Sequence, residues 1–139
     1  NSLISAVSNG QTKVLGGGEY CMRPLDTDDL SQALAKLACG PAQDSHVYEL
    51  VGPEPIAYRD LIKKAGKLME REVEVGSVPI LMAKLGAAIT STLKRGGITP
   101  TVIDVITLDE VVTENANEKI GISLTSLEDT LKKILASES

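Results

Sequence analysis

The stretch Val47 to Lys67, VYELVGPEPIAYRDLIKKAGK, decides how the rest of the chain is interpreted. With the preceding histidine, its first part (His46 to Val51) is rich in apolar and β-branched residues and predicts a short buried strand. The two prolines of Gly52-Pro53-Glu54-Pro55 then exclude regular structure and predict a turn. From Tyr58 to Arg71, apolar residues recur at helical spacing on one face: Leu61, Ile62, Ala65, Leu68 and Met69. A strand, a tight turn and an amphipathic helix in this order indicate an α/β protein.

Before this stretch, the sequence predicts the end of a helix and a pair of strands. A short apolar stripe at positions 3, 4 and 7 stops at Asn9-Gly10, which is a good helix C-cap. Thr12 to Leu15 is expected to form a strand, and Gly16 to Gly18 a turn that can adopt positive φ. Tyr20 to Leu25 is expected to return as the second strand of a hairpin. Pro24 places that strand at an edge, or at its own end, because proline cannot donate a ladder hydrogen bond.

A longer helix is predicted between Asp26 and Gly40-Pro41. Asp26 can cap its first turn, with Asp29 three residues later in a near capping box, and the Gly-Pro pair stops the helix. Its apolar residues recur at helical spacing: Leu30, Ala33, Leu34, Leu37 and Ala38.

After the central stretch, the sequence predicts a brief extended piece at Val73 to Val75 and Val78, followed by helices. One helix runs from Pro79 to Arg95, one begins at Pro100, and the last runs from about Ser123 to Ala136. The first of these is apolar on most faces and is expected to be buried or to lie in an interface. A membrane span needs about 20 apolar residues, whereas Lys84 interrupts a shorter run here, so this helix is not expected to span a membrane. A location on a membrane surface is the less favoured alternative to a buried or interface helix.

Length and composition favour one helix-rich α/β domain, residues 1–139, with a few short strands and about five helices. The chain has three tyrosines and no phenylalanine or tryptophan, so aliphatic residues must build its core. Its formal net charge is −5, whereas proteins that bind nucleic acid usually present a basic surface. A nucleic-acid partner is therefore not expected.

The residues that hold metals or cofactors show no suitable pattern. Cys21 and Cys39 fall in no C-x-x-C motif and lack histidines at ligand spacing, so we expect two reduced, buried thiols, with a disulfide as the alternative. A dinucleotide site needs G-x-G-x-x-G before a helix, but Gly16 to Cys21 lacks the last glycine and precedes an expected strand. The single His46 belongs to no Ser/His/Asp motif. We expect no catalytic, cofactor-binding or metal-binding residue in this chain.

The order of the segments nevertheless resembles a known superfamily. Asn9-Gly10 followed by KVLGGGEYCMRPLDTDDLSQAL is similar to the region just past the active site of extended short-chain dehydrogenases/reductases, the NAD-dependent epimerase/dehydratase superfamily. Relatives there have a glycine hairpin, a short strand and a V-D-D-[VL]-A-like helix start. The stretch 47–67 resembles their Y-x-L-x-G-P-E-x-x-[TS]-Y-x-E-L segment, except that Ala57 replaces the Thr or Ser helix cap. The pieces EVEVGSVP, ITPTVIDVITLDEVV and KIGISLTSLEDTLKKIL continue in the expected order.

Within that superfamily, the chain is most similar to an atypical branch, that of the NAD(P)H-binding accessory subunit of respiratory complex I. Arg23-Pro24-Leu25 is similar to the polar-Pro-Val pattern of that branch. The R-D-Y-I-H-V and R-P-G-D segments of nucleotide-sugar epimerases are absent, so a nucleotide-sugar substrate is not expected.

The resemblance implies that the chain is the C-terminal, substrate-binding lobe of a Rossmann-type protein. The superfamily uses a tyrosine with a lysine four residues later, but Tyr20, Tyr48 and Tyr58 are followed at that spacing by proline, glycine and isoleucine. The chain also begins without methionine, inside an expected helix, which suggests a fragment. We therefore expect an N-terminal dinucleotide-binding half elsewhere, which would supply the NAD or NADP site and the Tyr/Lys pair.

The resemblance also places the substrate against the residues at the hairpin. The corresponding positions are Val14, Leu15, Gly16 and Arg23. Arg23 could hold an anionic group as a fixed cation, or form a surface salt bridge with Asp26 or Asp28. Val14 to Gly16 could equally be core and turn.

Three hypotheses on function remain open at this point. The first is that the chain belongs to an NAD(P)-dependent oxidoreductase or epimerase that acts on a small molecule. The second is that it belongs to a non-catalytic NAD(P)H-binding protein that assembles with others, and the third is that it is an independent binding domain. We expect a homodimer or swapped assembly if the chain is stable alone, because its strands would leave an unpaired edge. The expected location is the cytoplasm, or an organelle matrix in a eukaryote.

Overall fold

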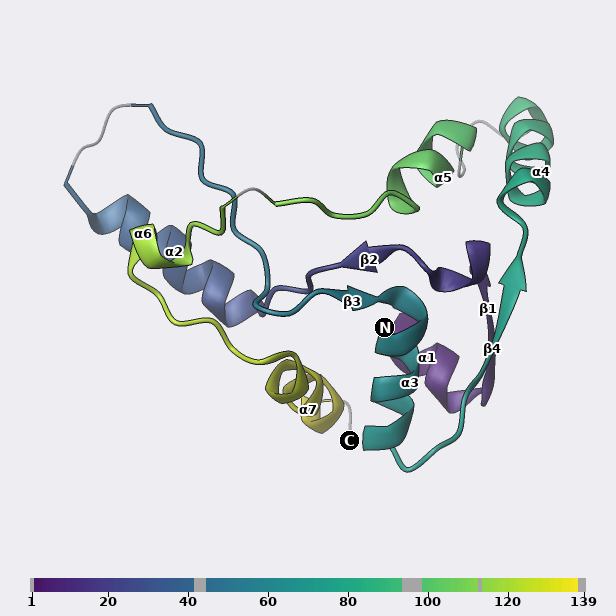
Figure 1. Ribbon diagram of the computed structural model, residues 1–139, viewed down its shortest axis with the longest axis horizontal. Helices are drawn as coiled ribbons and strands as arrows, with labels where there is room; N and C mark the ends of the chain where they lie inside the picture. The colour runs from purple at the N-terminus through teal and green to yellow at the C-terminus, as the bar shows by residue number, and fades with distance from the viewer. Residues whose placement is uncertain (1, 42–44, 94–98, 113, 138–139) are drawn as a thin grey trace. The chain divides into compact units, whose positions relative to one another are not determined.

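The computed structural model describes residues 2–41, 45–93, 99–112 and 114–137 (Figure 1). The chain divides into two compact units. The first unit contains Asn1–Met22 and Ile56–Asp109, and the second contains Arg23–Pro55 and Glu110–Ser139. Each unit is described separately below, and the expectation of a single domain over 1–139 stays a prediction.

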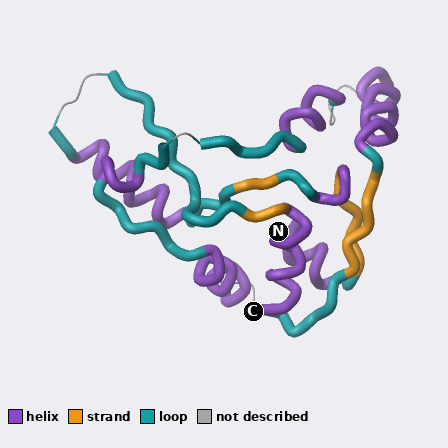
Figure 2. The backbone as a smooth tube through the Cα atoms, in the orientation of Figure 1, coloured by secondary structure: helices purple, strands orange, loops and turns teal. Residues whose placement is uncertain are grey.

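The first unit is built around a two-stranded parallel sheet. Strand β1 (Gln11–Leu15) pairs with β4 (Glu74–Val78), from Gln11 opposite Glu74 to Leu15 opposite Val78 (Figure 2). Helix α1 (Ser2–Ser8) packs against α3 (Tyr58–Leu68). The apolar face predicted for the helix after Tyr58 is confirmed, because its central residues are buried together with residues of α1 and β1: Val7, Val14, Leu61, Ile62 and Ala65.

The predicted hairpin between β1 and the following strand is wrong. Strand β2 (Cys21–Met22) pairs antiparallel with β3 (Ile56–Ala57), immediately before α3. Gly16, Gly17 and Gly18 form the 3₁₀ turn η1 (Gly16–Gly18), and all three have positive φ, as the sequence predicted. Instead of reversing the chain, this turn directs it to the start of α3, where Tyr58 N–H donates to Tyr20 O at 3.1 Å. The strand ends before Pro24, as expected.

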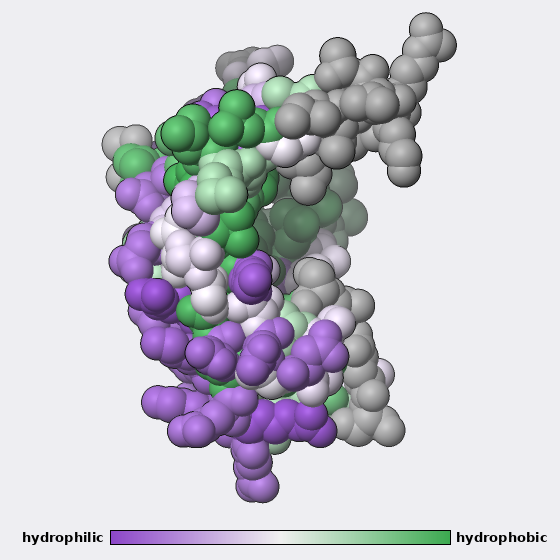
Figure 3. All heavy atoms as spheres, turned by 90° about the vertical axis from the view of Figure 1, so that its right-hand side faces the viewer, coloured by the Kyte–Doolittle hydropathy of each residue, from purple (hydrophilic) through white to green (hydrophobic). Residues whose placement is uncertain are grey.

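The last two helices of the first unit present much of their apolar surface outward. Helix α4 (Ile80–Leu93) follows Pro79, and α5 (Pro100–Ile106) is capped by Thr99 Oγ1, which accepts from Val102 N–H. The predicted stop of α4 at Arg95 to Gly97 lies outside the described residues. Large apolar side chains are exposed on both helices: Leu81, Met82, Leu85, Val102, Val105 and Ile106. Figure 3 shows hydrophobic side chains gathered over α4 in the upper part of its view. None of the described helices has the length and apolar character to cross a membrane.

The second unit is helical. Asp26 caps α2 (Thr27–Cys39) as predicted, and Gly40 follows its last residue. Asp29 forms no capping box, because its carboxylate instead accepts from the N–H and hydroxyl of Thr125. That anchor precedes α7 (Leu127–Ser137), which therefore begins later than predicted, with Ser126 Oγ accepting from Asp129 N–H. The core of the unit consists of Ala33, Val51, Ala116, Ile122, Leu127 and Leu131.

In the second unit, one prediction is wrong and one element was missed. His46 to Val51 forms no strand, and the short helix α6 (Asn117–Ile120) was not predicted. The unit has no β-strand among its described residues, so this strand-prone segment has no sheet to join.

The two cysteines lie in different units. Both are free, as expected, but Cys21 is only half-buried and Cys39 is exposed, contrary to the expectation of buried thiols.

Candidate functional site

An apolar pocket of about 440 Å³ lies in the first unit, and we call it the tyrosine pocket. It is bounded by α1, β1, β2 and the first residue of α3, with the last residue of α5 at its margin. The residues that line it are Ala6, Thr12, Lys13, Val14, Leu15, Tyr20, Met22, Tyr58 and Ile106. Aliphatic and aromatic side chains with few polar groups are the usual lining of small-molecule sites.

Two stacked tyrosines give the pocket its aromatic wall. The ring centroids of Tyr20 and Tyr58 are 5.6 Å apart, with 17° between the ring planes. Burial, and to a lesser extent the neighbouring Tyr58, raise the pKa of Tyr20 above its ordinary value of 10.0. The Tyr20 hydroxyl therefore stays protonated at neutral pH and can donate a hydrogen bond, for example to a carbonyl oxygen.

The glycine turn brings the two tyrosines together. A Cβ on Gly18 would lie 2.9 Å from Arg59 N and 3.0 Å from a methyl carbon of Val14, so only glycine permits this approach of η1 to α3. Arg59 Nη1 also donates to Glu19 Oε1 at 2.5 Å, which ties the turn to the first residues of the helix. Ala57, the N-cap of α3, makes no side-chain cap hydrogen bond, so these contacts fix the helix start instead.

Two of the four predicted substrate residues line this pocket. Val14 and Leu15 come from the end of β1, whereas Gly16 is not among the lining residues. A Cβ on Gly16 would meet the Ile80 side chain at 3.0 Å, so its role here is close packing in the turn. The aromatic wall was not predicted, because Tyr20 and Tyr58 meet through the β2–β3 pairing, which joins Cys21 to Ala57 and Met22 to Ile56, far apart in the sequence.

Arg23 belongs to the second unit, and its side chain lies against the Gly52 turn. Its Nη2 donates to Pro53 O at 3.5 Å, and its backbone N–H donates to Glu110 Oε2 at 2.6 Å. Neither expected salt bridge, to Asp26 or to Asp28, is found within the described part of the chain. Both carboxylates accept instead from Lys133. The Arg23 Nε is buried and has no hydrogen-bond partner among the described residues.

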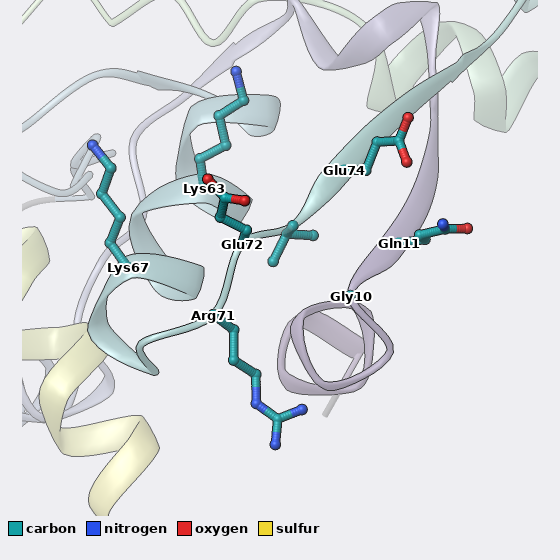
Figure 4. A pocket seen from close by; sticks show the side chains of 8 residues that line it. Gly10, Gln11, Lys63, Lys67, Arg71, Glu72 and Glu74 are labelled. Atoms are coloured by element: carbon teal, nitrogen blue, oxygen red, sulfur yellow. The ribbon is translucent and has the colours of Figure 1, made fainter.

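A second, more polar pocket of about 580 Å³ lies at the other end of the sheet. It is lined by Gly10, Gln11, Lys63, Lys67, Arg71, Glu72, Val73 and Glu74 (Figure 4). In Figure 4 the side chains of Lys63 and Lys67 both extend toward the top of the view, whereas Arg71 points downward toward α1, where its Nη1 donates to Ser8 O. Because its cations diverge and two carboxylates share the lining, this pocket is a poorer candidate for an anionic ligand.

The His, Cys, Asp and Glu side chains, which are possible metal ligands, are spread over the described residues. No cluster of three His, Cys, Asp or Glu side chains suited to a metal ion is found there. Of the two pockets described above, the tyrosine pocket is the more suited to an organic ligand.

Comparison with known proteins identifies the fold. No family model and no curated protein matches the sequence. Solved structures match nearly the whole chain, among them triphenylmethane reductase of Citrobacter sp. (TM-score 0.70, 19% identity, 97% of this chain and 47% of that chain). Another is the NADPH-dependent quinone oxidoreductase QOR2 of Escherichia coli (TM-score 0.67, 18% identity, 96% of this chain and 48% of that chain). Both have been solved with NADP(H) or NADPH bound.

This chain spans about half the length of those reductases. At this identity the likeness shows the fold alone. It confirms the predicted fold class, a helix-rich α/β protein with few short strands, similar to part of NADP(H)-dependent reductases.

Proposed function

We propose that this chain is the substrate-binding lobe of an NAD(P)-dependent oxidoreductase of the extended short-chain type, and that it is not catalytic alone. The tyrosine pocket carries this proposal, because it is an organic-ligand site on a fold similar to NADP(H)-dependent reductases. The sequence has neither a phosphate-binding glycine loop before a helix nor a tyrosine followed by lysine four residues later. NAD or NADP and the proton-transfer groups would come from a dinucleotide-binding half. Epimerisation is the alternative reaction within the same superfamily.

The substrate class best suited to the pocket is a planar, mainly apolar carbonyl compound. The stacked pair of Tyr20 and Tyr58 offers an aromatic surface, and the protonated Tyr20 hydroxyl offers a donor. The two reductases of similar fold are named for a quinone and for triphenylmethane dyes, which are also aromatic or conjugated molecules. Val14 and Leu15 would contact the substrate directly, with Gly16 shaping the turn. Arg23 belongs to the second unit and stays a separate proposal, as a cation for an anionic group.

Tyrosine fluorescence tests this substrate class. The chain has no tryptophan, and two of its three tyrosines line the pocket, so a bound quinone should quench most of the emission. We expect saturable quenching by 2-methyl-1,4-naphthoquinone. Ile106→Asp should weaken binding about tenfold or more, because a carboxylate at the pocket margin opposes an apolar ligand.

Val105→Asp is the matched control, because Val105 precedes Ile106 on the same helix, is exposed and does not line the pocket. It should leave the quinone affinity within about twofold of that of the unaltered chain. Non-saturable quenching, or equal losses in the two variants, would contradict the proposed substrate class.

A non-catalytic NAD(P)H-binding protein, similar to the complex I accessory subunit, is the second candidate. The exposed apolar side chains of α4 and α5 favour it, because such surfaces commonly mediate protein assembly. NADPH-binding and quinone-reduction assays on the protein encoded by the complete reading frame distinguish the two candidates. NADPH binding with quinone reduction supports the oxidoreductase, whereas NADPH binding without turnover of carbonyl substrates supports the assembly protein.

A further inference from the structure

We infer that Asp109 is a positioning residue of the tyrosine pocket, because its carboxylate fastens the pocket wall at the end of α5 to strand β2. This inference rests on the proposed function and adds a residue that sets how tightly the pocket holds its ligand. Asp109 does not line the pocket, so it acts through Ile106, Tyr20 and Met22, which do. All four residues belong to the first unit.

The wall that contains Ile106 is the least firmly held side of the pocket. Strand β1 is paired with β4, β2 is paired with β3, and α1 packs on α3. Helix α5, by contrast, packs mainly on α4, and the ion pair between Asp104 and Lys84 also holds it to that helix. Ile106 is the last residue of α5 and is 45% exposed. A wall at the end of a helix that is anchored elsewhere needs a further contact to stay against the pocket.

Asp109 supplies that contact. The segment that leaves α5 runs along β2 (Figure 1), and Asp109 Oδ1 accepts from Cys21 N–H at 2.8 Å. The acceptor lies three residues beyond Ile106, and the donor lies between Tyr20 and Met22 in the sequence. One hydrogen bond therefore joins the α5 side and the β2 side of the pocket, close to the residues that line it.

The geometry of β2 explains why this N–H needs a side-chain acceptor. In an antiparallel pair, successive residues direct their backbone groups to opposite edges. Tyr20 O accepts from Tyr58 N–H on the β3 side, so Cys21, the next residue, directs its N–H to the other edge. A carboxylate is a stronger acceptor than a neutral oxygen. Because Asp109 is exposed, water competes for it, so we expect its loss to weaken ligand binding several-fold rather than abolish it.

The next residue has the same chemistry in the other unit and offers a matched control. Glu110 Oε2 accepts from Arg23 N–H at 2.6 Å, and both residues belong to the second unit. Neither lines the tyrosine pocket. Glu110→Ala therefore removes a carboxylate that accepts from a backbone N–H, but leaves the contact between Asp109 and Cys21 in place.

Acrylamide quenching of tyrosine emission tests the position of the wall without a ligand. Two of the three tyrosines line the pocket. Asp109→Ala should raise the quenching constant about twofold, because Ile106 would shield the rings less. Asp109→Asn keeps an oxygen that can accept from Cys21 N–H, so its constant should stay close to that of the unaltered chain. An unchanged constant in Asp109→Ala, or an equal increase in Glu110→Ala, would overturn the inference.

Binding of 2-methyl-1,4-naphthoquinone tests the consequence for the ligand. Asp109→Ala should weaken binding about fivefold, mainly through faster dissociation. Asp109→Asn should restore most of the affinity, and Glu110→Ala should bind within about twofold of the unaltered chain. Because linkage is reciprocal, bound quinone should slow hydrogen exchange of the Cys21 amide in the unaltered chain by about the same factor of five. A purely structural role of Asp109 would give no such slowing.

The outcomes for positioning and for the proposed function are separate. If the quinone does not bind to the unaltered chain, the proposed substrate class fails, and acrylamide quenching still decides the role of Asp109. If the quinone binds equally well to Asp109→Ala and to the unaltered chain, the positioning role fails and the substrate class stands.

Discussion

At the scale of single residues, Asp26 shows how a buried charge can be stabilised. Burial alone would raise the pKa of its carboxyl, but hydrogen bonds from Asp28 N–H, the Thr130 hydroxyl and Lys133, together with the charge of Lys133, hold the pKa below its ordinary value of 3.8. The side chain is 4% exposed, so these partners replace water. Asp26 thereby joins the start of α2 to α7.

Replacing Asp26 should destabilise the chain and alter its pH dependence. Asp26→Ala removes a helix cap and the partner of the Thr130 hydroxyl, with an expected loss of about 2 kcal/mol in unfolding free energy. Because the native pKa is lowered, the ionised carboxylate stabilises the fold above pH of about 4, and this contribution is lost as pH falls further. Urea unfolding at several pH values measures both effects.

Asp26→Asn is the informative control. Asparagine can still cap the helix but cannot pair with Lys133 as an ion, so its stability loss should be smaller and vanish in acid. Equal losses at pH 7 and at pH 3 would contradict the assigned charge interaction.

The titration of Tyr20 should reflect its partly buried position in the tyrosine pocket. Its raised pKa predicts that it ionises above pH 10, with the fold losing stability as pH rises because the native state retains the proton longer. Tyr58→Phe removes one of the two causes, so the pKa of Tyr20 should fall toward its ordinary value without reaching it. Alkaline absorbance titration follows this change, and an unchanged or higher pKa in the variant would contradict it.

At the scale of elements, two turns require glycine for reasons that can be separated. Gly10 lies between α1 and β1, and Gly18 lies in η1. Gly10 and Gly18 have nearly equal positive φ values, +70° and +71°. A Cβ on Gly10 meets nothing within 4 Å, whereas one on Gly18 would lie 2.9 Å from Arg59 N. Comparing alanine at these positions therefore separates backbone strain from steric exclusion.

Gly10→Ala should lower the unfolding free energy by about 1 kcal/mol, from left-handed strain alone. Gly18→Ala should lower the unfolding free energy by at least about 2 kcal/mol more than Gly10→Ala does, because η1 must move away from α3. Thermal and urea unfolding provide the comparison. Near-equal losses of unfolding free energy in the two variants would show that η1 can move away from α3 at little cost.

The sequence predicted those elements that depend on local signals. Periodicity located α2, α3 and α4, and capping residues such as Asp26 and Gly40 marked their ends, because both act within a few residues. Strand pairing could not be predicted in this way. The β1–β4 ladder joins residues more than 60 positions apart, and short strands carry little information on their partner.

The residues of the candidate site divide in the same way, into those that local sequence predicted and those that depend on tertiary packing. Val14 and Leu15 were expected from a resemblance that covers their local segment, and both line the tyrosine pocket. Tyr58 and Ile106 join that pocket through tertiary packing, for which neither spacing nor composition gave a signal. The prediction of a strand at His46 to Val51 failed for a different reason, because the described residues of its unit form no sheet that this segment could join.

At the scale of the whole molecule, the exposed apolar surface of α4 and α5 should promote self-association. Leu81, Met82 and Leu85 project from α4, in a chain whose pI is about 4.9. We expect multi-angle light scattering to give a mass above that of the monomer that rises with protein concentration, most strongly near pH 5 where net charge is smallest.

Leu85→Glu should shift this equilibrium toward monomer. Thr101→Glu adds the same charge at an exposed polar position of α5 and should have little effect by comparison. A monomeric mass for the unaltered chain at every concentration would contradict self-association.

The chain alternates between its two units, and this restricts how the protein can be divided. It passes from one unit to the other after Met22, after Pro55 and after Asp109. Cleavage of any single peptide bond therefore releases neither unit whole, and neither can be transferred to another gene as one continuous block. Joining residue 1 to residue 139 and opening the chain elsewhere does not change this, because the alternation persists around the closed circle. The two units must be synthesised, inherited and engineered together.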